Sequence, residues 1–250
     1  MNTTNNTVLI TGGSAGIGFE IAKLFTENGN HVIITGRNKE RLQEAAARLQ
    51  NVTAIPFDVT SEADVEALAQ RIEKEFPSLN ILVNNAGRAF FYKLDEQNNA
   101  ATKAADEMLT NYISVVRLTE KLLPVLQKQD EAAIVNVSSI VAIAGRHTMA
   151  TYAASKAALH SYTNSLRIAL AQTGNVKVFE LMPPLVNTEL SREIGGARGI
   201  PPSEVASDLL HSIQNDIYEI HTGNTADLYS LFLSSPAEAL KRMNLEATPA

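Results

Sequence analysis

Short apolar runs rich in β-branched residues recur along the chain, and most of them are followed by a segment whose apolar residues have helical spacing. These runs predict strands, in chain order, at residues 7–10, 31–35, 52–57, 81–83, 132–137 and 176–181, with a weaker seventh at 218–221. Strands that alternate with helices form a parallel sheet that helices cover on both faces. We therefore expect an α/β protein, a single-domain Rossmann-like doubly wound parallel sheet of about seven strands.

The segments between the strands predict the helices. The first helix carries Ile17 on its apolar stripe and ends at a glycine cap, Gly29, and Ser61 with Asp64 forms a capping box for the helix that ends near Phe76. The other predicted helices cover residues 39–49, 96–127, 151–171, 203–215, 225–233 and 236–243. In the 96–127 helix, the residues spaced for burial are Met108, Leu109, Tyr112, Val115, Val116 and Leu122.

The composition limits what the chain can do. Its 250 residues, 45% of them hydrophobic, suffice for one large core, and the absence of cysteine excludes disulfides, thiolate metal ligands and thiolate nucleophiles. No metal site is predicted, because no metal-ligand spacing occurs among His31, His160, His211 and His221. The net charge of −6 gives no reason to expect binding to nucleic acid or to an anionic membrane. The polar first residues and the lack of a long apolar run predict a cytoplasmic protein.

A glycine-rich turn, ThrGlyGlySerAlaGlyIleGly, follows the first predicted strand directly. Glycines in such a turn let the backbone approach a phosphate, whose charge then meets free amides and the positive end of the helix dipole. Gly12, Gly16 and Gly18 are placed for that role. The spacing GxGxxG is not matched, because Ile21 occupies the position of its third glycine. We expect a phosphate cradle here, and a glycine turn without a ligand is the alternative.

The end of the second predicted strand bears on the choice of cofactor. An acidic residue at this place would bind the ribose of NAD, but the chain has Arg37 followed by Asn38. A guanidinium can hold a 2′-phosphate through two parallel hydrogen bonds, and the amide adds a donor. We therefore expect NADP(H), with NADPH preferred over NADH. A solvated arginine at the start of a helix is the alternative.

A hydroxyl, a phenol and an ammonium follow the fifth predicted strand, at Ser139, Tyr152 and Lys156. Tyr152 and Lys156 are i and i+4 neighbours on one face of the helix expected from residue 151. A nearby cation favours the phenolate and lowers the pKa of a tyrosine, which makes the phenol a usable general acid and base. An exposed tyrosine beside a lysine, without chemistry, is the alternative for this pair alone.

These motifs together resemble the short-chain dehydrogenase/reductase family, over most of the chain through about Thr188. The glycine-rich turn matches the family's TGxxxGxG, and AsnAsnAlaGly at 84–87 matches its NNAG segment. The positions of the family's catalytic tetrad are taken by Asn111, Ser139, Tyr152 and Lys156, with Ser139 preferred to Ser138 because 13 residues separate the family's serine from its tyrosine. The resemblance implies cofactor binding by Gly12, Ser14, Ala15, Gly16, Ile17, Gly18, Arg37, Asn38, Asp58, Val59, Asn85, Ala86, Gly87, Tyr152, Lys156, Pro183, Val186 and Thr188.

More narrowly, the chain is similar to the DltE-type oxidoreductases, in the N-terminal turn, in AlaLeuHisSer after Lys156 and in MetProProLeuValAsnThr. It departs from the usual family pattern where Pro184 replaces a glycine and where the last strand is followed by extra helices. The second departure puts the family's common tetramer interface in doubt. We expect a homo-oligomer, a homodimer paired through the 96–127 and 151–171 helices, with a tetramer as the alternative.

The resemblance implies an NADP(H)-dependent enzyme that interconverts a carbonyl (ketone or aldehyde) and an alcohol, acting on CH–OH groups. Ser139 would stabilise the negative charge that develops on the carbonyl oxygen, and Tyr152 would donate the proton. Lys156 would bind the nicotinamide ribose, and Asn111 would position a water. A non-catalytic NADP(H) sensor or scaffold is the alternative, and an epimerase or dehydratase is a further one.

The expected domain has three parts, which differ in what they contribute to such a site. Residues 5–188 form the expected cofactor-binding and catalytic core, 185–202 a lid over the substrate, and 203–250 the C-terminal helices and last strand. Disorder without function is the alternative for the lid. His147 is a candidate substrate contact or a surface residue, and Phe90, Phe91 and Tyr92 are candidate pocket walls or core residues.

Overall fold

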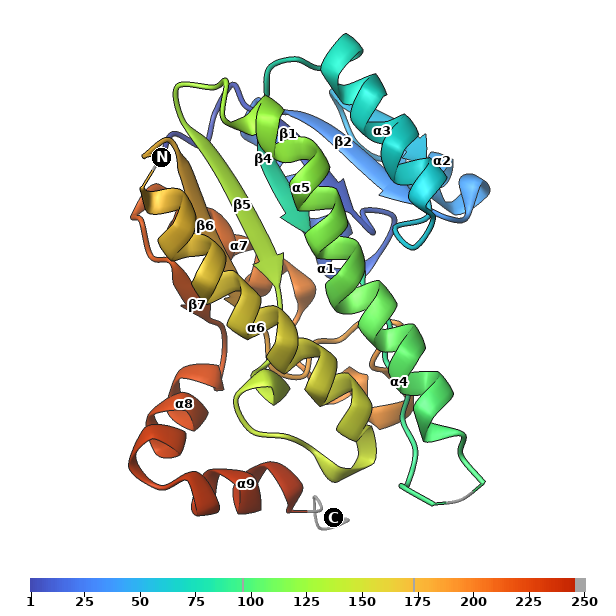
Figure 1. Cartoon of the computed structure of the whole chain (residues 1–250), viewed down its shortest axis with the longest axis vertical. Coiled ribbons are helices and arrows are strands. Elements are labelled where there is room, and N and C mark those ends of the chain that lie inside the picture. The colour runs from blue at the N-terminus through green and yellow to red at the C-terminus, as the bar shows by residue number, and fades with distance from the viewer. Residues whose placement is uncertain (96, 173, 246–250) are drawn as a thin grey trace.

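The structure is a computed structural model that describes residues 1–95, 97–172 and 174–245. Seven strands form one parallel sheet in the order β3-β2-β1-β4-β5-β6-β7 (Figure 1). The strands are β1 (Thr7–Thr11), β2 (His31–Gly36), β3 (Val52–Pro56), β4 (Leu79–Asn84), β5 (Ala132–Val137), β6 (Val176–Met182) and β7 (Glu219–His221). The predicted α/β class, parallel sheet and strand order of a doubly wound fold are confirmed.

Helices cover both faces of this sheet. One face carries α1 (Gly16–Glu27), α2 (Lys39–Ala46) and α7 (Pro202–Gln214), and the other carries α3 (Glu62–Glu75), α5 (Ser114–Leu126) and α6 (Ala150–Ala171). Figure 1 looks onto the second face, with α5 and α6 in front of the strands. Below the strand ends lie α4 (Ala100–Met108), α8 (Thr225–Ser234) and α9 (Pro236–Asn244). The strands read as unbroken apolar runs because helices bury them on both faces.

The strand order places a cleft at one point of the sheet. β1 pairs with β2 on one side and with β4 on the other, so the chain reverses its direction of winding at β1. The loops that leave the carboxyl ends of β1 and β4 therefore run apart, and ligands of such sheets bind in the crevice between them. The glycine-rich turn and the NNAG segment are the two loops at this point.

The segment predicted as one helix over 96–127 is built differently from the expectation. Its start at residue 96 lies outside the described residues, and α4 and α5 are joined by a π-helical turn, Leu109–Ile113. Val115 and Leu122 are buried as predicted, and the other four residues predicted to be buried are only partly buried. Glu107 and Asn111, both fully buried, point inward instead. The reason is that α4 and the π turn face the site rather than the sheet core, and polar groups are needed there.

Two further expectations are corrected or refined by the local structure. The 39–49 helix ends at Ala46, and Leu49 is only partly buried. Ser61 caps α3 as predicted by accepting a hydrogen bond from the backbone N–H of Asp64. The Asp64 carboxylate accepts the Ser61 hydroxyl through Oδ1 and, in addition, the backbone N–H of Asp58 through Oδ2, both at 2.9 Å. The second bond holds the Asp58 turn next to the start of the helix.

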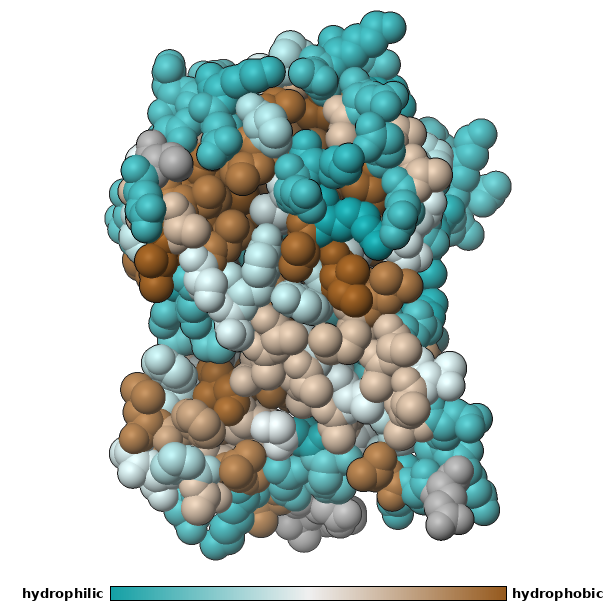
Figure 2. Space-filling model, viewed as in Figure 1, coloured by the Kyte–Doolittle hydropathy of each residue, from teal (hydrophilic) through white to brown (hydrophobic). Residues whose placement is uncertain are grey.

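The face drawn in Figure 2 is hydrophilic at the top, where α3 lies, and weakly polar or apolar in the middle, where α5 and α6 run. Ile168 of α6 is 70% exposed, and Ile113 at the start of α5 is 41% exposed. The homodimer expected through these two helices stays a prediction.

Over the three described ranges, no helix has the length and apolar character needed to cross a membrane.

Candidate active site

A cavity of about 1250 Å³ opens at the carboxyl ends of the strands. The glycine-rich turn, the ends of β2, β4, β5 and β6, and the first turns of α6 all contribute to its wall. Among the predicted cofactor-binding residues, those that line it are Gly12, Ser14, Ala15, Gly16, Ile17, Arg37, Asn38, Asp58, Val59, Asn85, Ala86, Gly87, Pro183, Val186 and Thr188. Ser139, Tyr152 and Lys156 line the same cavity. Gly18 and Asn111 do not line the cavity. Each of them has a structural role beside it.

The glycine-rich turn has the conformation that only glycines adopt easily. Gly12 and Gly16 have φ values of +68° and +55°, in the left-handed region. Ala15, the N-cap residue of α1, makes no side-chain cap bond, and no acidic residue stands in the first turn. The first amides of α1 are therefore not capped by a side chain and face the cavity with the positive end of the helix dipole. A dinucleotide phosphate fits these donors.

Gly18 has a packing role instead of a cavity-facing one. A Cβ atom there would lie 2.4 Å from the carbonyl oxygen of Gly12 and 2.4 Å from Nδ2 of Asn85. The absence of a side chain thus lets α1 begin directly against the turn and against the loop after β4. Asn85 completes the contact by donating to the carbonyl oxygens of Thr11 and Gly12, at 2.9 and 3.2 Å.

Cationic and acidic residues meet at the far end of the cavity, after β2 and β3. Arg37 makes no ion pair or hydrogen bond with any residue in the described ranges, so its guanidinium is available to a ligand. Asn38 caps α2 by accepting the backbone N–H of Arg41 at 2.7 Å, which leaves its Nδ2 donor for other partners. Burial acts to raise the pKa of Asp58, but hydrogen bonds from Thr60 and the charge of Arg37 outweigh it, so the pKa lies below its ordinary value.

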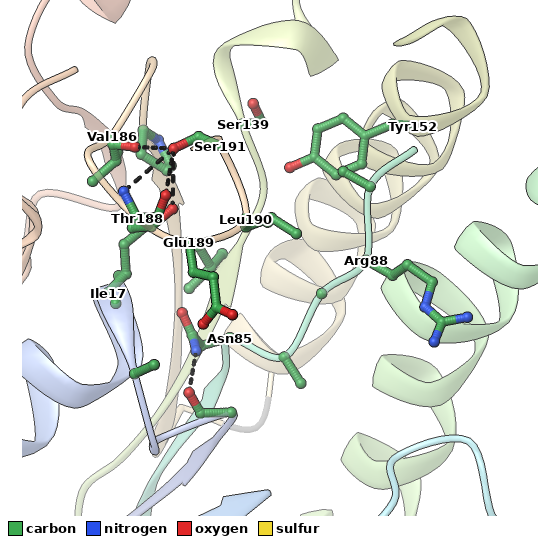
Figure 3. A pocket seen from close by; sticks show the side chains of 18 of the residues that line it. Ile17, Asn85, Arg88, Ser139, Tyr152, Val186, Thr188, Glu189, Leu190 and Ser191 are labelled. Atoms are coloured by element: carbon green, nitrogen blue, oxygen red, sulfur yellow. Dashed lines mark hydrogen bonds between the residues drawn. The ribbon is translucent and has the colours of Figure 1, made fainter. Parts of the chain in front are cut away.

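The three chemically active groups come from β5 and α6. Ser139 follows β5 and is 7% exposed, and its Oγ accepts the backbone N–H of Val141 at 3.3 Å. The Lys156 ammonium donates to the carbonyl oxygen of Val137 at 2.8 Å and lies 5.7 Å from the ring centre of Tyr152. Figure 3 shows the phenol of Tyr152 pointing into the cavity, toward the side on which Ser139 lies.

The pKa of Tyr152 shifts in the opposite direction from the sequence-based expectation. Burial raises it to about 12, a hydrogen bond with Ser139 acts to lower it, and the charge of Glu107 raises it further. Lys156 does not lower it here, because burial also lowers the pKa of Lys156 to about 8 and the ammonium is bound to a backbone carbonyl. The phenol therefore holds its proton firmly at neutral pH. This state suits a proton donor.

Asn111 is a clamp rather than a wall of the cavity. Its Oδ1 accepts the backbone N–H of Arg88 at 2.8 Å, and its Nδ2 donates to the carbonyl oxygen of Arg88 and to Oγ of Ser155, at 2.8 and 2.9 Å. Both N–H donors of the side chain are in use, and the water that Asn111 would position stays a prediction. The bonds to Arg88 and Ser155 reach beyond the helical turn that carries Asn111. Asn111 fixes the NNAG loop against α6.

Residues 185–202, predicted as a lid, form a folded loop beside the glycine-rich turn. Asn187 and Ile200 close its base through a backbone hydrogen bond of 2.9 Å, and Oγ of Ser191 bonds back to Thr188. Glu189 forms an ion pair with Arg41 of α2, which joins the loop to the opposite rim of the cavity. Hydrogen bonds thus fix this loop in an ordered conformation. Whether it opens and closes stays a prediction.

Comparison with known proteins agrees with this geometry. Residues 6–198 match the family model for short chain dehydrogenases. The chain belongs to this family. Among its curated relatives, the oxidoreductase DltE of Bacillus subtilis is 42% identical over 208 residues, 83% of this chain and 82% of that protein. An oxidoreductase of Staphylococcus aureus is 30% identical over 84% of this chain and 91% of its own.

Solved structures of short-chain dehydrogenases have the same fold. One from Burkholderia cenocepacia in complex with NADP has a TM-score of 0.87 at 25% identity over the full length of both chains. One from Burkholderia phymatum in complex with NAD has a TM-score of 0.85 at 21% identity, over 100% of this chain and 99% of that one. The RhlG/NADP complex of Pseudomonas aeruginosa is 29% identical over 84% of this chain and 89% of its own, with a TM-score of 0.77. The chain is thus a short-chain oxidoreductase of the nicotinamide-binding type.

Several residues of this dehydrogenase site were not predicted. Met149, Asn224 and Met243 line the cavity, and the latter two lie beyond residue 198, where the family match ends. No sequence motif marks them, because only the fold brings α8 and α9 to the strand ends. Arg41 was also missed, although its position one turn after Arg37 at the start of a helix is a signal that could have indicated it.

Of the aromatic and histidine residues proposed for the site, some line the cavity and others make hydrogen bonds outside it. Phe91 lines the cavity, whereas Tyr92 bonds through its hydroxyl to Oγ1 of Thr151 at 2.8 Å. His147 is exposed, does not line the cavity, and bonds through Nδ1 to Oδ1 of Asn244 at 2.9 Å. It is a surface residue that ties α9 to the loop before α6. In the described parts of the chain no cluster of residues is suited to hold a metal ion.

Proposed function

We propose that this short-chain dehydrogenase is an NADP(H)-dependent oxidoreductase that interconverts a ketone or aldehyde and an alcohol, with Tyr152 as proton donor. The observation that carries the proposal is the convergence of Ser139, Tyr152 and Lys156 on the cavity that the glycine-rich turn opens into. A binding protein needs the turn but has no use for a buried phenol beside a hydroxyl and an ammonium. The NADP complexes of its structural neighbours support the choice of cofactor class.

The residues perform separate parts of the reaction. When bound, the nicotinamide cofactor supplies the hydride that adds to the carbonyl carbon. Ser139 donates a hydrogen bond to the carbonyl oxygen, where negative charge gathers. Tyr152, which holds its proton at neutral pH, gives that proton to the same oxygen, and the reverse transfer serves alcohol oxidation. The Lys156 ammonium offers hydrogen bonds to a ribose of the bound cofactor.

Arg37 and Asn38 support a preference for NADPH over NADH. The guanidinium is exposed, unpaired within the described residues, and stands where β2 ends at the cavity. Arg37→Gln is expected to raise the Kd for NADPH by about 10- to 100-fold, the worth of a charge-assisted hydrogen-bond pair, and to leave the Kd for NADH nearly unchanged. Titration of the fluorescence of each reduced cofactor with the protein measures this. NADH binding as tight as NADPH binding in the unaltered protein would contradict the preference.

The loop at 185–202 is proposed to act as a lid that the Arg41–Glu189 pair holds down. An exposed ion pair is weak and screened by salt, so Glu189→Gln is expected to speed NADPH dissociation by up to about fivefold, with a smaller effect at high salt. Stopped-flow displacement of NADPH measures the rate. The matched control is Glu75→Gln, which breaks the exposed Arg71–Glu75 pair on α3, away from the cavity. Equal dissociation rates in both variants would exclude the lid.

A substrate screen tests the function as a whole. NADPH oxidation is followed by absorbance with a panel of ketones and aldehydes, and NADP reduction with the corresponding alcohols. Turnover of at least one carbonyl, with the alcohol as product, supports the proposal. Tight NADPH binding without turnover of any member would favour a sensor or scaffold, and conversion without net change in NADPH would favour an epimerase or dehydratase.

A further inference from the structure

A row of polar side chains continues from Lys156 along the buried side of α6. Lys156, His160, Asn164 and Arg167 follow one another at helical spacing, so they share one face of the helix. This face packs on β6 and β7, whose residues Glu180 and Glu219 are paired in register. The catalytic mechanism above uses only the first member of the row.

Glu180 is the most deeply buried carboxylate of this row. It is 0% exposed, and its Oε2 accepts a hydrogen bond from Nδ1 of His160 at 2.8 Å. Its Oε1 is buried and has no hydrogen-bond partner among the described residues. Asn164 donates from Nδ2 to Nε2 of His160 at 3.2 Å, an arrangement that places the imidazole proton on Nδ1, toward Glu180. The imidazole thereby fixes the position of the carboxylate.

His160, which holds this carboxylate, lies one helical turn after Lys156 on α6. The Lys156 side chain is only 4% exposed, and its ammonium donates to Val137 of β5, the strand next to the one that carries Glu180. Burial disfavours the charged amine and lowers its pKa, whereas the charge of Glu180 acts in the opposite direction. A buried ammonium needs such a counter-charge.

Apart from His160, the other charged groups near Glu180 have partners of their own or are neutral, so they do not neutralise its carboxylate. Arg167 is engaged by Glu219 at 3.3 Å and by the carbonyl oxygen of Val178 at 2.8 Å. His221 of β7 stacks on Tyr229 of α8, and burial lowers its pKa, so it is neutral above pH 7. The bond to Glu180 raises the pKa of His160, so a protonated His160 shares the charge of Glu180. Once His160 has lost its proton, Glu180 keeps a negative charge that neither Arg167 nor His221 shares.

We propose that Glu180, held in place by His160, is the counter-charge that keeps Lys156 protonated in the active site. Glu180 does not line the cavity, so it acts through Lys156 as a positioning residue and touches neither cofactor nor substrate. The proposal deepens the proposed function and rests on it for its catalytic consequence. The electrostatic part concerns Lys156 alone and is testable without any substrate.

The test measures the pKa of the Lys156 amine directly. Only the neutral amine reacts with dilute acetic anhydride, so the midpoint of Lys156 acetylation against pH, read by mass spectrometry, gives its pKa. Glu180→Gln removes the charge and nearly keeps the shape, and it is expected to lower that midpoint by about one pH unit. Glu219→Gln is the matched control, because it removes a charge from the same face, one strand further from Lys156, and should leave the midpoint unchanged.

Two further measurements keep the outcomes distinct. Glu180→Asp retains the charge one methylene further back, so its midpoint should lie between those of the unaltered protein and E180Q; it carries the test if E180Q does not fold. An unchanged midpoint in folded E180Q or in E180D, or an equal fall in E219Q, overturns the proposal. NADPH affinity should decline at a lower pH in E180Q. A lowered midpoint in a protein that turns over no carbonyl would uphold this inference and refute the proposed function.

Discussion

Tyr152→Phe is expected to lower kcat for carbonyl reduction by about 10²- to 10⁴-fold, the usual contribution of a general acid. The phenol points into the cavity and holds its proton at neutral pH. The substitution removes one oxygen and leaves the ring packing intact, so the Kd for NADPH should stay within about threefold. Steady-state kinetics and a cofactor titration measure the two quantities.

The control for this prediction is a second tyrosine of the same helix. Tyr162 is half-buried and packs edge-on against Tyr112, 6.0 Å between ring centres, outside the cavity. Tyr162→Phe should keep the activity of the unaltered protein. Substantial turnover by Tyr152→Phe would assign the proton transfer to another group and remove the basis of the mechanism.

Gly18→Ala is expected to weaken both cofactor binding and stability. The added methyl would meet the carbonyl oxygen of Gly12 at 2.4 Å, and a backbone atom can yield only if the glycine-rich turn moves. Overpacking of this kind costs about 1–3 kcal/mol in the free energy of unfolding. Since the turn forms the phosphate site, the Kd for NADPH should rise at least about tenfold. Urea denaturation and cofactor titration measure the two effects.

Gly29→Ala separates steric conflict from backbone conformation. Gly29 follows α1 with φ of +77°, and no atom lies within 4 Å of the place where its Cβ would stand. An alanine there should cost about 1–2 kcal/mol through the left-handed conformation alone and leave the Kd for NADPH unchanged. A cofactor affinity equal to that of the unaltered protein in Gly18→Ala would show that Gly18 does not set the shape of the turn.

The sheet was predictable because its strands are buried on both faces. A strand such as β5, all six of whose residues are buried, must be apolar along its whole length, and that requirement is visible in the sequence. The helix before it was less predictable. Glu107 and Asn111 point inward to bind the loop at 88–90, and a hydrophobic pattern does not indicate a buried carboxylate or amide.

The site was predictable as a set of motifs but not as an electrostatic environment. The spacing of Tyr152 and Lys156 shows that the two groups are neighbours, yet the sign of a pKa shift depends on burial, which spacing does not report. The role of Glu180 could not be predicted from the sequence for a similar reason. It lies within a strand that reads as a core strand, and only the packing of α6 on β6 brings it to Lys156.

The placement of α8 and α9 separates two properties of the enzyme along the polypeptide. The groups proposed to move hydride and proton all precede residue 198, whereas Asn224 and Met243 form part of the wall from beyond it. Asn244 anchors that wall by donating to the carbonyl oxygen of Gly145 at 2.9 Å. Changes in the C-terminal helices can therefore alter one part of the cavity wall without replacing any of the proposed reactive groups. This part of the wall can vary independently of the catalytic residues along the polypeptide.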